Sequence, residues 1–433
     1  MKKLLCSVLM LILGGTTLLA QELTISPYSR YGIGDIQGNI NARNAAMGGI
    51  SIATDNYFSI NRQNPGSFAD LVYTTLDISG FGQYSSLRSD ITNEDQVTAG
   101  FQNIGLGFSS NRKVILVMGF APYSIVGYNV NSLRENIAVG DTTFSELANY
   151  QGQGGLNQVY GGIGVRLLKR KLRVGASFNF NFGRTEYSSE ATLNTGATNF
   201  LPARFDEDIY LSGPGASFGG MYVIDSIKGT DGVFLRLGAS MDIQSTLEGS
   251  RQTFLVNSFD PTSTLNDTIR DQEGDVILPL RIGVGAMIHK PARWSLGADF
   301  VYQDWSTFEY FDDDVDLGAD WRVSVGGEWT PNYESNKYFN RVSYRFGGYV
   351  KQSYILFEEE AVNDVGVTFG FALPSALKAT NRFDRGRASS RINMSFIFGR
   401  RGNLNSQPLE ELYARFQLGV TLNDTWFVRR VID

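Results

Sequence analysis

The chain has 433 residues, with 38 Lys and Arg, 44 Asp and Glu, one Cys and one His, and a formal net charge of -6. The single Cys excludes an internal disulfide and a Cys-clustered metal site, and the single His excludes multi-His metal centres and His-based catalytic triads. Net acidity argues against nucleic-acid binding, because no basic excess exists to replace counterions on phosphates. The composition therefore predicts no cofactor, no metal site and no nucleic-acid partner.

The first 20 residues have the pattern of a secretory signal peptide. Lys2 and Lys3 precede an apolar run from Leu4 to Leu13, and small residues lead to a predicted cleavage point after Ala20. The apolar run is short for a membrane-spanning helix, so a retained anchor is the less favoured alternative. We expect export, and a mature chain without cysteine.

Alternating strands dominate the rest of the sequence. No apolar stretch after residue 20 reaches 18 residues, whereas many segments are apolar at every second position. The clearest example places Leu172, Val174, Ala176, Phe178, Phe180 and Phe182 on one face and Arg173, Gly175, Ser177, Asn179, Asn181 and Gly183 on the other. Such alternation is typical of lipid-facing strands of an outer-membrane β-barrel. A soluble sandwich also alternates, but its exposed face is usually charged and rich in Lys.

Fourteen such segments follow one another, which predicts a closed 14-stranded antiparallel β-barrel. They lie near residues 70–84, 103–109, 113–124, 156–168, 171–187, 208–224, 232–247, 277–289, 293–304, 319–330, 341–353, 363–373, 387–400 and 411–422. Tight connections alternate with the long connections 125–155, 188–207 and 248–276, so we expect short periplasmic turns and long outer loops. The connection 374–386 is long on the periplasmic side and breaks this rule. Trp294, Trp305, Trp321, Trp329 and Trp426 lie near strand ends, as in an interfacial aromatic girdle.

The residues between the signal peptide and the first strand are too polar for a lipid face. They are rich in Gly, Asn and Ala and lack a ten-residue alternation. A barrel of about 14 strands is wider than its own side chains fill, so a channel or a plug must occupy its centre. We therefore predict a signal peptide at 1–20, a hatch inside the barrel at 21–69 and the barrel at 70–433. An ordinary periplasmic extension is the alternative for the hatch.

Two regions resemble the FadL-type outer-membrane transporters of long-chain fatty acids and other hydrophobic compounds. The segment AMGGISIATDNYFSINRQNPGSF is similar to that family's N-terminal hatch, through Ala46, Gly48, Gly49, Asp55, Asn64 and Pro65, with Gly66 in place of the family's Ala. The C-terminal stretches NMSFIFGRRG and LGVTLNDTWFVRR resemble the closing hairpin of divergent members. The strand number also agrees. The resemblance is specific only at these two ends.

The resemblance implies binding-assisted passage of a hydrophobic ligand and its sideways release beside a kinked strand. Gly119 and Pro122 are the candidate kink, because Pro cannot donate a ladder hydrogen bond and Gly weakens pairing. A doubly apolar strand supplies Ile115, Val117 and Ala121 to a candidate ligand pocket, together with Phe58 and Phe68 of the hatch. Packing of this strand against the hatch explains the same residues equally well.

Charged residues fall on the predicted inner face of the strands. They are Arg166, Arg173, Arg236, Asp242, Arg281, Asp299, Arg322, Glu328, Arg345 and Arg415. We interpret them as a salt-bridged wall that holds the hatch through Arg43, Asp55 and Arg62. A less favoured hypothesis has one Arg binding a ligand carboxylate bidentately. No catalytic residue is predicted, since the one histidine, His289, falls in an expected periplasmic turn far from other polar clusters.

The sequence thus predicts an integral protein of the bacterial outer membrane, in contact with lipid and lipopolysaccharide. We expect passive uptake of hydrophobic molecules such as long-chain fatty acids. A FadL-like barrel that acts as a non-transporting scaffold or shuttle for secreted or surface proteins is the alternative, which a filled lumen without an oily groove would favour. A porin for polar solutes is a third option and requires a wide, hydrated lumen without a hatch.

Overall fold

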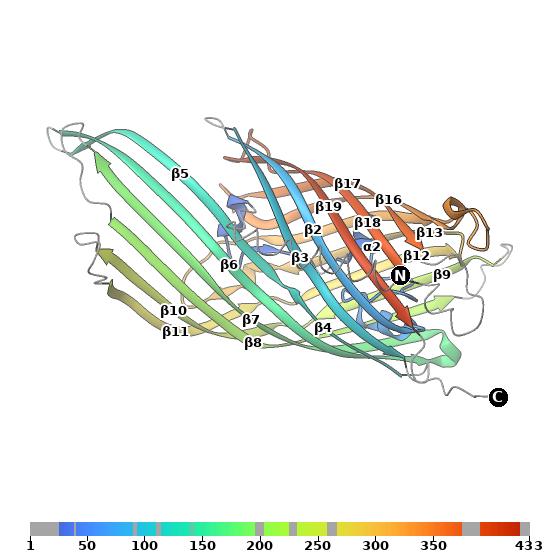
Figure 1. Cartoon of the computed structure of the whole chain (residues 1–433). Coiled ribbons are helices and arrows are strands. Elements are labelled where there is room, and N and C mark those ends of the chain that lie inside the picture. Colours follow the sequence, from blue (N-terminus) through green and yellow to red (C-terminus); the bar gives the residue numbers. More distant parts are fainter. Residues whose placement is uncertain are drawn as a thin grey trace, which may run out of the picture.

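The computed structural model describes residues 26–38, 40–89, 93–109, 114–139, 142–194, 203–224, 232–257, 266–374 and 390–424. The described residues form an elongated barrel of tilted strands around an N-terminal segment (Figure 1). Helices are short: η1 spans Pro27–Arg30, α2 Ala42–Ala45, η2 Pro65–Asp70, η3 Leu168–Arg170, η4 Trp305–Thr307 and η5 Tyr338–Arg341. Among these residues, no helix is long and apolar enough to cross a membrane.

The strands carry most of the chain. In order they are β1 Asp35–Ile36, β2 Thr74–Arg88, β3 Asn93–Ser109, β4 Val114–Pro122, β5 Ser124–Val139, β6 Thr142–Leu167, β7 Leu172–Asn194, β8 Ala203–Ile224, β9 Phe234–Asp242, β10 Ser245–Asn257, β11 Asn266–Leu278, β12 Arg281–Lys290, β13 Trp294–Asp304, β14 Glu309–Tyr310, β15 Ala319–Trp329, β16 Ser343–Phe357, β17 Glu360–Pro374, β18 Arg391–Arg401 and β19 Glu410–Asp424.

The predicted 14-stranded antiparallel barrel is confirmed. β4 and β5, β9 and β10, and β11 and β12 are each two parts of one interrupted wall strand, and the short β1 and β14 lie outside the wall. The last strand, β19, pairs with the first, β2, from Glu410↔Arg88 to Asp424↔Thr74, which closes the ring. Closure satisfies backbone donors and acceptors along this junction, as lipid requires. The barrel begins at Thr74 rather than at the predicted residue 70.

The alternation of the sequence sets which side chains face lipid. On β4, Leu116 and Met118 are about half exposed on the outside, whereas Ile115, Val117 and Ala121 are buried on the inside. Phe178, Phe180 and Phe182 face outward in the same way on β7. The period of two thus separates an oily exterior from a packed interior, as predicted.

The expected long outer loops are largely strands, which corrects the prediction. Residues 125–155 form β5 and most of β6, and residues 248–276 lie mostly in β10 and β11. Strands tilted by about 35–45° need about 10 residues to cross an apolar band of about 25 Å. Since β6 spans Thr142–Leu167, it extends well beyond that band. Where these strands extend beyond the membrane their sequence is polar, and the prediction therefore assigned these residues to loops.

Beyond the membrane, one group of strands separates from the neighbouring wall strands on both sides. The group consists of β5, β6, β7, β8, β10 and β11. β3 pairs with β4 only from Ile104 to Ser109, and the ladders described for β5 join it to β6 and to β1. β11 pairs with β10 and, at Val276 and Ile277, with β14, while β13 continues with β15. Figure 1 shows β5 and β6 parting from β2 and β3 toward the far end.

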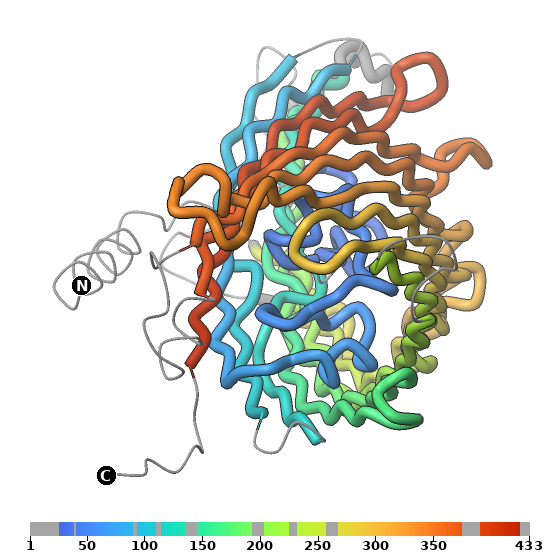
Figure 2. Tube along the Cα trace, turned by 90° about the vertical axis from the view of Figure 1, so that its right-hand side faces the viewer, coloured from blue at the N-terminus to red at the C-terminus, as the bar shows by residue number. Residues whose placement is uncertain are grey.

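The N-terminal segment, residues 26–73, lies inside the ring (Figure 2). Its η2 packs against β6, β7 and β8, and its α2 against β17, β18 and β19. Glycines on the inner face permit this approach: a Cβ on Gly347 would clash with the backbone of Met47 and Gly48, and one on Gly164 with the backbone of Phe68 and Ala69. Glycines on the inner face therefore allow the backbone of the N-terminal segment to approach the wall closely.

An apolar cluster fills the outer half of the lumen. The connection between β13 and β15 folds inward and buries Trp305, Phe308, Phe311 and Leu317, and Trp305 stacks on Tyr354 with ring centroids 4.5 Å apart. Tyr28 and Ile33 of the N-terminal segment join this cluster. We call it the outer cap. Trp305 is completely buried here, so its prediction as a girdle residue is wrong.

Candidate functional site

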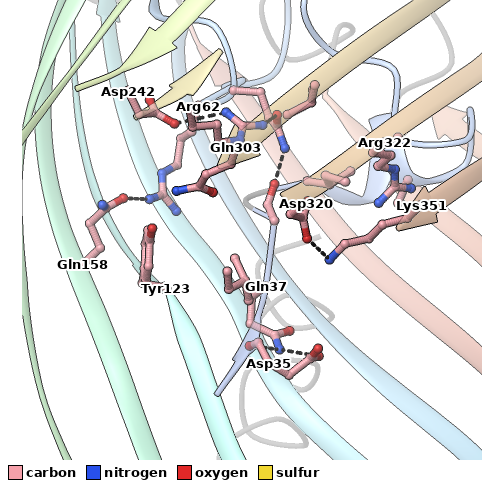
Figure 3. Close-up of a pocket in the computed structure, with 18 of the residues that line it drawn as sticks. Asp35, Gln37, Arg62, Tyr123, Gln158, Asp242, Gln303, Asp320, Arg322 and Lys351 are labelled. Carbon is pink, nitrogen blue, oxygen red and sulfur yellow. Dashed lines mark hydrogen bonds and ion pairs between the residues drawn. The ribbon is translucent and has the colours of Figure 1, made fainter. Parts of the chain in front are cut away.

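A cavity of about 230 Å³ lies between the N-terminal segment and the barrel wall. Figure 3 shows side chains from both converging on this space, with Arg62 directed at Gln158 and Lys351 at Asp320. Charged and amide side chains supply much of its lining: Asp35, Arg62, Asp242, Arg281, Asp299, Asp320, Arg322, Lys351, Asp364, Arg401, Glu411 and Arg415, with Gln37, Gln63, Gln83, Gln102, Gln158, Gln303, Gln417, Asn179 and Asn181. The lining therefore mixes charged and amide groups with apolar and aromatic side chains.

Acidic and basic groups balance around the cavity. Six of its ionisable lining residues are acidic and six are basic, and several form ion pairs with one another. Arg281 lies 3.0 Å from Asp242, and Lys351 lies 3.1 Å from Asp320. Apolar and aromatic side chains, among them Ile36, Ile40 and Phe68, contribute at least as much of the lining surface. The lining thus offers hydrogen bonds beside its apolar surface.

Asp70, at the end of η2, is the main ionic anchor of the N-terminal segment. Its carboxylate accepts hydrogen bonds from Arg173 and from Arg236 Nη1, the latter at 2.6 Å, and the carboxylate is completely buried. Burial alone would raise the pKa of Asp70, but the Arg236 and Arg173 guanidiniums outweigh it and hold that pKa below its usual range. The sequence prediction missed Asp70 because it assigned this residue to the first barrel strand.

A second ionic group joins the segment to the opposite wall. Arg43 pairs with Asp55 at 3.0 Å and approaches Glu328 of β15 at 3.7 Å. Glu328 also accepts a hydrogen bond from Arg345 at 2.6 Å. Of the predicted partners, Arg43 reaches the wall through an ion pair, whereas Arg62 hydrogen bonds to the neutral Gln158.

His289 is not in a turn, which corrects the prediction. It lies in β12, is buried, and its Nε2 accepts a hydrogen bond from Arg236 at 3.2 Å. Its Nδ1 lies 3.9 Å from Asp55. The prediction assigned His289 to the turn because it lies next to Lys290, the last residue of β12. The alternation of inward and outward residues along β12 indicates its inward position.

The charged wall predicted from alternation is present. Several of its members bind the backbone of the N-terminal segment rather than a carboxylate. Asp299 accepts hydrogen bonds from the backbone N–H groups of Ser51 and Ile52, and Arg322 donates to the Gly48 carbonyl oxygen. Arg166 donates to carbonyl oxygens of residues 69–71.

The six residues of the hatch motif lie at bends and caps of the N-terminal segment. Gly48 and Gly49 have φ of 70° and 88°, a conformation that favours glycine, and Gly48 N–H donates to Thr368. Asn64 caps η2 and also donates to the Ile52 carbonyl oxygen, and Pro65 follows at the first helical position. Ala46 is buried, and Asp55 pairs with Arg43.

The candidate kink lies where the third wall strand is interrupted. β4 ends at Pro122 and β5 begins at Ser124, and Tyr123 between them accepts a backbone hydrogen bond from Gln37 of the N-terminal segment. Gly119 lies under the ring of Tyr160, with no room for a Cβ. The strand break is thus observed, and its use as a lateral opening stays a prediction.

The candidate ligand-pocket residues are only partly brought together. Ile115, Val117 and Phe68 form a buried cluster with Ile60, Leu71 and Tyr160. Phe58 lies elsewhere, stacked on Tyr73. Of the predicted set, only Phe68 lines the cavity. The cluster packs β4 against the N-terminal segment, and its role in ligand binding stays a prediction.

Tryptophans at the short-turn end fit an interfacial girdle better than Trp305 does. Trp294 and Trp329 are exposed and lie opposite each other on β13 and β15. Trp321 lies within β15, and Trp426 lies outside the described residues. Aromatic pairs of this kind favour the membrane–water interface.

The chain is similar to a known family in sequence and to solved structures in fold. The BamG family model matches residues 1–433. The chain belongs to the BamG family. No curated protein matches this BamG-family chain.

Solved structures share its fold. The Ralstonia pickettii toluene transporter TbuX is 13% identical with a TM-score of 0.53, covering 89% of this chain and 98% of its own. The CymD monoaromatic hydrocarbon channel is 13% identical with a TM-score of 0.52, over 92% and 100%. A Pseudomonas aeruginosa FadL homologue is 12% identical with a TM-score of 0.52, over 94% and 100%. The chain therefore has the FadL-like barrel fold of these outer-membrane proteins.

Proposed function

We propose that this protein is a plugged, non-conducting barrel of the bacterial outer membrane that acts as a scaffold by binding other proteins. One observation carries the proposal: among the described residues, the outer cap and the N-terminal segment occupy the lumen, and charged and amide side chains line much of the cavity that remains. The outer cap packs at the far end with Tyr28 and Ile33 of the N-terminal segment, and Asp70 anchors the segment to the wall at the other end. The cavity between this segment and the wall presents charges and amides beside its apolar side chains.

The energetics of an oily ligand support this proposal. Binding of an apolar molecule depends on removing apolar surface from water, at about 25 cal/mol per Å². In this cavity the same molecule would displace water from charged and amide groups and leave them without partners, which costs roughly 1–3 kcal/mol for each such group.

Uptake of hydrophobic molecules with lateral release is the second candidate function. The interruption between β4 and β5 favours it, because β3 has ladder partners on β4 only from Ile104 to Ser109. An opening in the wall at that height would let a hydrophobic molecule enter the bilayer. The likeness to CymD, TbuX and a FadL homologue concerns the fold and agrees with either candidate.

A paired measurement distinguishes the two candidates. Full-length protein is reconstituted in vesicles, and entry of a fluorescent long-chain fatty acid is compared with that in protein-free vesicles. The same protein is purified from its native membrane after mild chemical crosslinking. We expect equal fatty-acid entry in both kinds of vesicle and a stoichiometric protein partner after crosslinking.

The Pro122→Ala variant sharpens the comparison. Pro122 ends β4, and Ala restores a backbone donor at the interruption. Saturable fatty-acid uptake that this variant slows, in a barrel that remains folded, would establish transport and remove the scaffold proposal.

A further inference from the structure

A group of strands continues past the membrane as a sheet of its own. In the described part of the chain its order is β5–β6–β7–β8–β10–β11, joined by continuous ladders. Unlike the closed wall below, this sheet has two edges, β5 and β11. Sheet edges with free backbone groups are templates for pairing with another strand, so proteins usually protect them.

The β11 edge is protected by charge. Its outer part carries Asp267, Arg270, Asp271, Glu273 and Asp275 within nine residues, and all five are exposed. At its inner end β14 pairs with Val276 and Ile277. Charged side chains along an edge strand discourage the addition of a further strand.

The β5 edge already accepts strand-like pairing from the N-terminal segment. Asp35 and Ile36 of β1 lie opposite Ile125 and Ser124. Further out, the Gly127 carbonyl oxygen accepts a hydrogen bond from Ser26 N–H at 3.1 Å, and Gly127 N–H donates to Ser29 Oγ at 3.1 Å. These contacts show that both backbone groups of Gly127 point away from β6.

The register then fixes which later groups point to the open side. In an antiparallel ladder, both backbone groups of a residue point to the same side, and the side alternates along the strand. The ladder between β5 and β6 is regular from Val126 to Arg134. The backbone groups of Asn129, Asn131 and Leu133 therefore point to the open edge. The stretch from Tyr128 to Leu133 carries no charge.

Side chains on the outer face of this edge form a graded surface, which changes from polar to apolar with distance from the membrane. Asn149 of β6 donates to both Asn129 and Asn131 at 2.8 Å, which makes an amide patch. Leu133 lies opposite Leu147, and the two are 62% and 54% exposed. A strand added here would meet amides near the membrane and an apolar pair farther out.

We propose that the β5 edge from Asn129 to Leu133 docks an extended strand of a different protein. The docked strand is uncharged where it faces Asn129 and Asn131 and has an apolar side chain against Leu133 and Leu147. This inference rests on the proposed scaffold function and names the surface that would serve it. Main-chain hydrogen bonds would supply affinity, and the graded outer face would supply register.

A second copy of the chain does not fit this edge. Two copies in one membrane are related by rotation about the membrane normal, and barrel strands tilt by about 35–45° from it. Such a rotation reverses the tilt, so the two β5 strands would cross at about 70–90° and could not form a ladder. This geometry excludes a second copy, and the occupant that we propose is a strand of another protein.

The test uses the full-length protein in its native cells. A photoreactive benzoylphenylalanine replaces Leu133 on the β5 edge or, as a position control, Ile269 on β11, which is 55% exposed. Each is combined with Asn131→Pro or Asn131→Ala. Both substitutions remove the Asn131 amide, but only Pro removes the backbone N–H on the open side, while the ladder to β6 uses Val130 and Ser132.

We expect a discrete adduct from position 133, retained with Asn131→Ala and lost with Asn131→Pro, and no such adduct from position 269. Heat-modified mobility on gels confirms that each variant is folded. The docking proposal is overturned if Asn131→Pro retains the adduct, if position 269 gives the same adduct, if the adduct is a second copy, or if none forms. A partner that still co-purifies with Asn131→Pro would overturn only this surface, whereas saturable fatty-acid uptake would overturn the scaffold function as well.

Discussion

At the scale of single residues, the ion pair between Asp70 and Arg236 is the most deeply buried one among the described residues. Two guanidiniums, of Arg173 and Arg236, share the buried carboxylate of Asp70. The Asp70→Asn variant leaves both cations without a counter-charge in the interior, so we expect the free energy of unfolding to fall by about 3–5 kcal/mol. Thermal loss of the β-sheet circular dichroism signal in detergent measures this. Asp267→Asn, at an exposed site on β11, is the control and should change little.

The same carboxylate predicts how the N-terminal segment responds to acid. Because the pKa of Asp70 in the folded state is depressed, its stabilisation is fully present above the unfolded-state pKa and disappears only as pH falls through the folded-state value. Protease protection of residues 26–73 should therefore be unchanged between about pH 7 and about pH 5. Release of the segment within that interval would contradict this expectation and mean that groups other than Asp70 control its release.

At the scale of elements, β6 and η2 can pack closely because Gly164 of β6 has no side chain. A Cβ on Gly164 would lie 2.8 Å from the Phe68 carbonyl carbon, whereas one on Gly161 of the same strand meets nothing within 4 Å. Gly164→Ala should destabilise the barrel by about 1–3 kcal/mol through overpacking. Gly161→Ala should be neutral or slightly stabilising. Equal melting temperatures for the two variants would show that η2 does not pack as described.

Interrupted strands mark the elements that periodicity predicts least well. Alternation predicted a strand at 113–124 with Leu116 outward and Val117 inward, and the structure has β4 at Val114–Pro122 with this facing. It did not predict that the chain continues as β5 after Tyr123. The pattern of side chains indicates which face each residue occupies, but not which strand its backbone pairs with. The partner of β5 at this point is the N-terminal segment, which is distant in sequence.

At the scale of the whole molecule, the sequence predicted the closed barrel because lipid imposes a simple rule on every spanning strand. The strand number and the facing of the side chains follow from it. The interior obeys no such rule. Asp70, the buried position of His289 and the burial of Trp305 depend on contacts between distant segments. Polar residues could be assigned to the lumen, but their partners could not be deduced from one strand at a time.

Two groups of contacts, one at each end of the lumen, predict that the intact protein does not conduct ions. The outer cap closes one end through stacked Trp305 and Tyr354, and the Asp70 anchor holds the N-terminal segment at the other. In planar bilayers we expect no conductance steps from the native protein. Asp70→Asn alone or Trp305→Ala alone should leave one group of contacts intact and stay silent.

The double variant Asp70→Asn with Trp305→Ala should show discrete or flickering openings, because the cavity then connects with water at both ends. Phe339→Ala in place of Trp305→Ala is the matched control, since this aromatic ring is 73% exposed and lies outside the cap. Conductance of the native protein would contradict the plugged barrel and favour a porin. Silence of a correctly folded double variant would show that the N-terminal segment blocks the lumen even without its ionic anchor, through the close backbone contacts at Gly347 and Gly164.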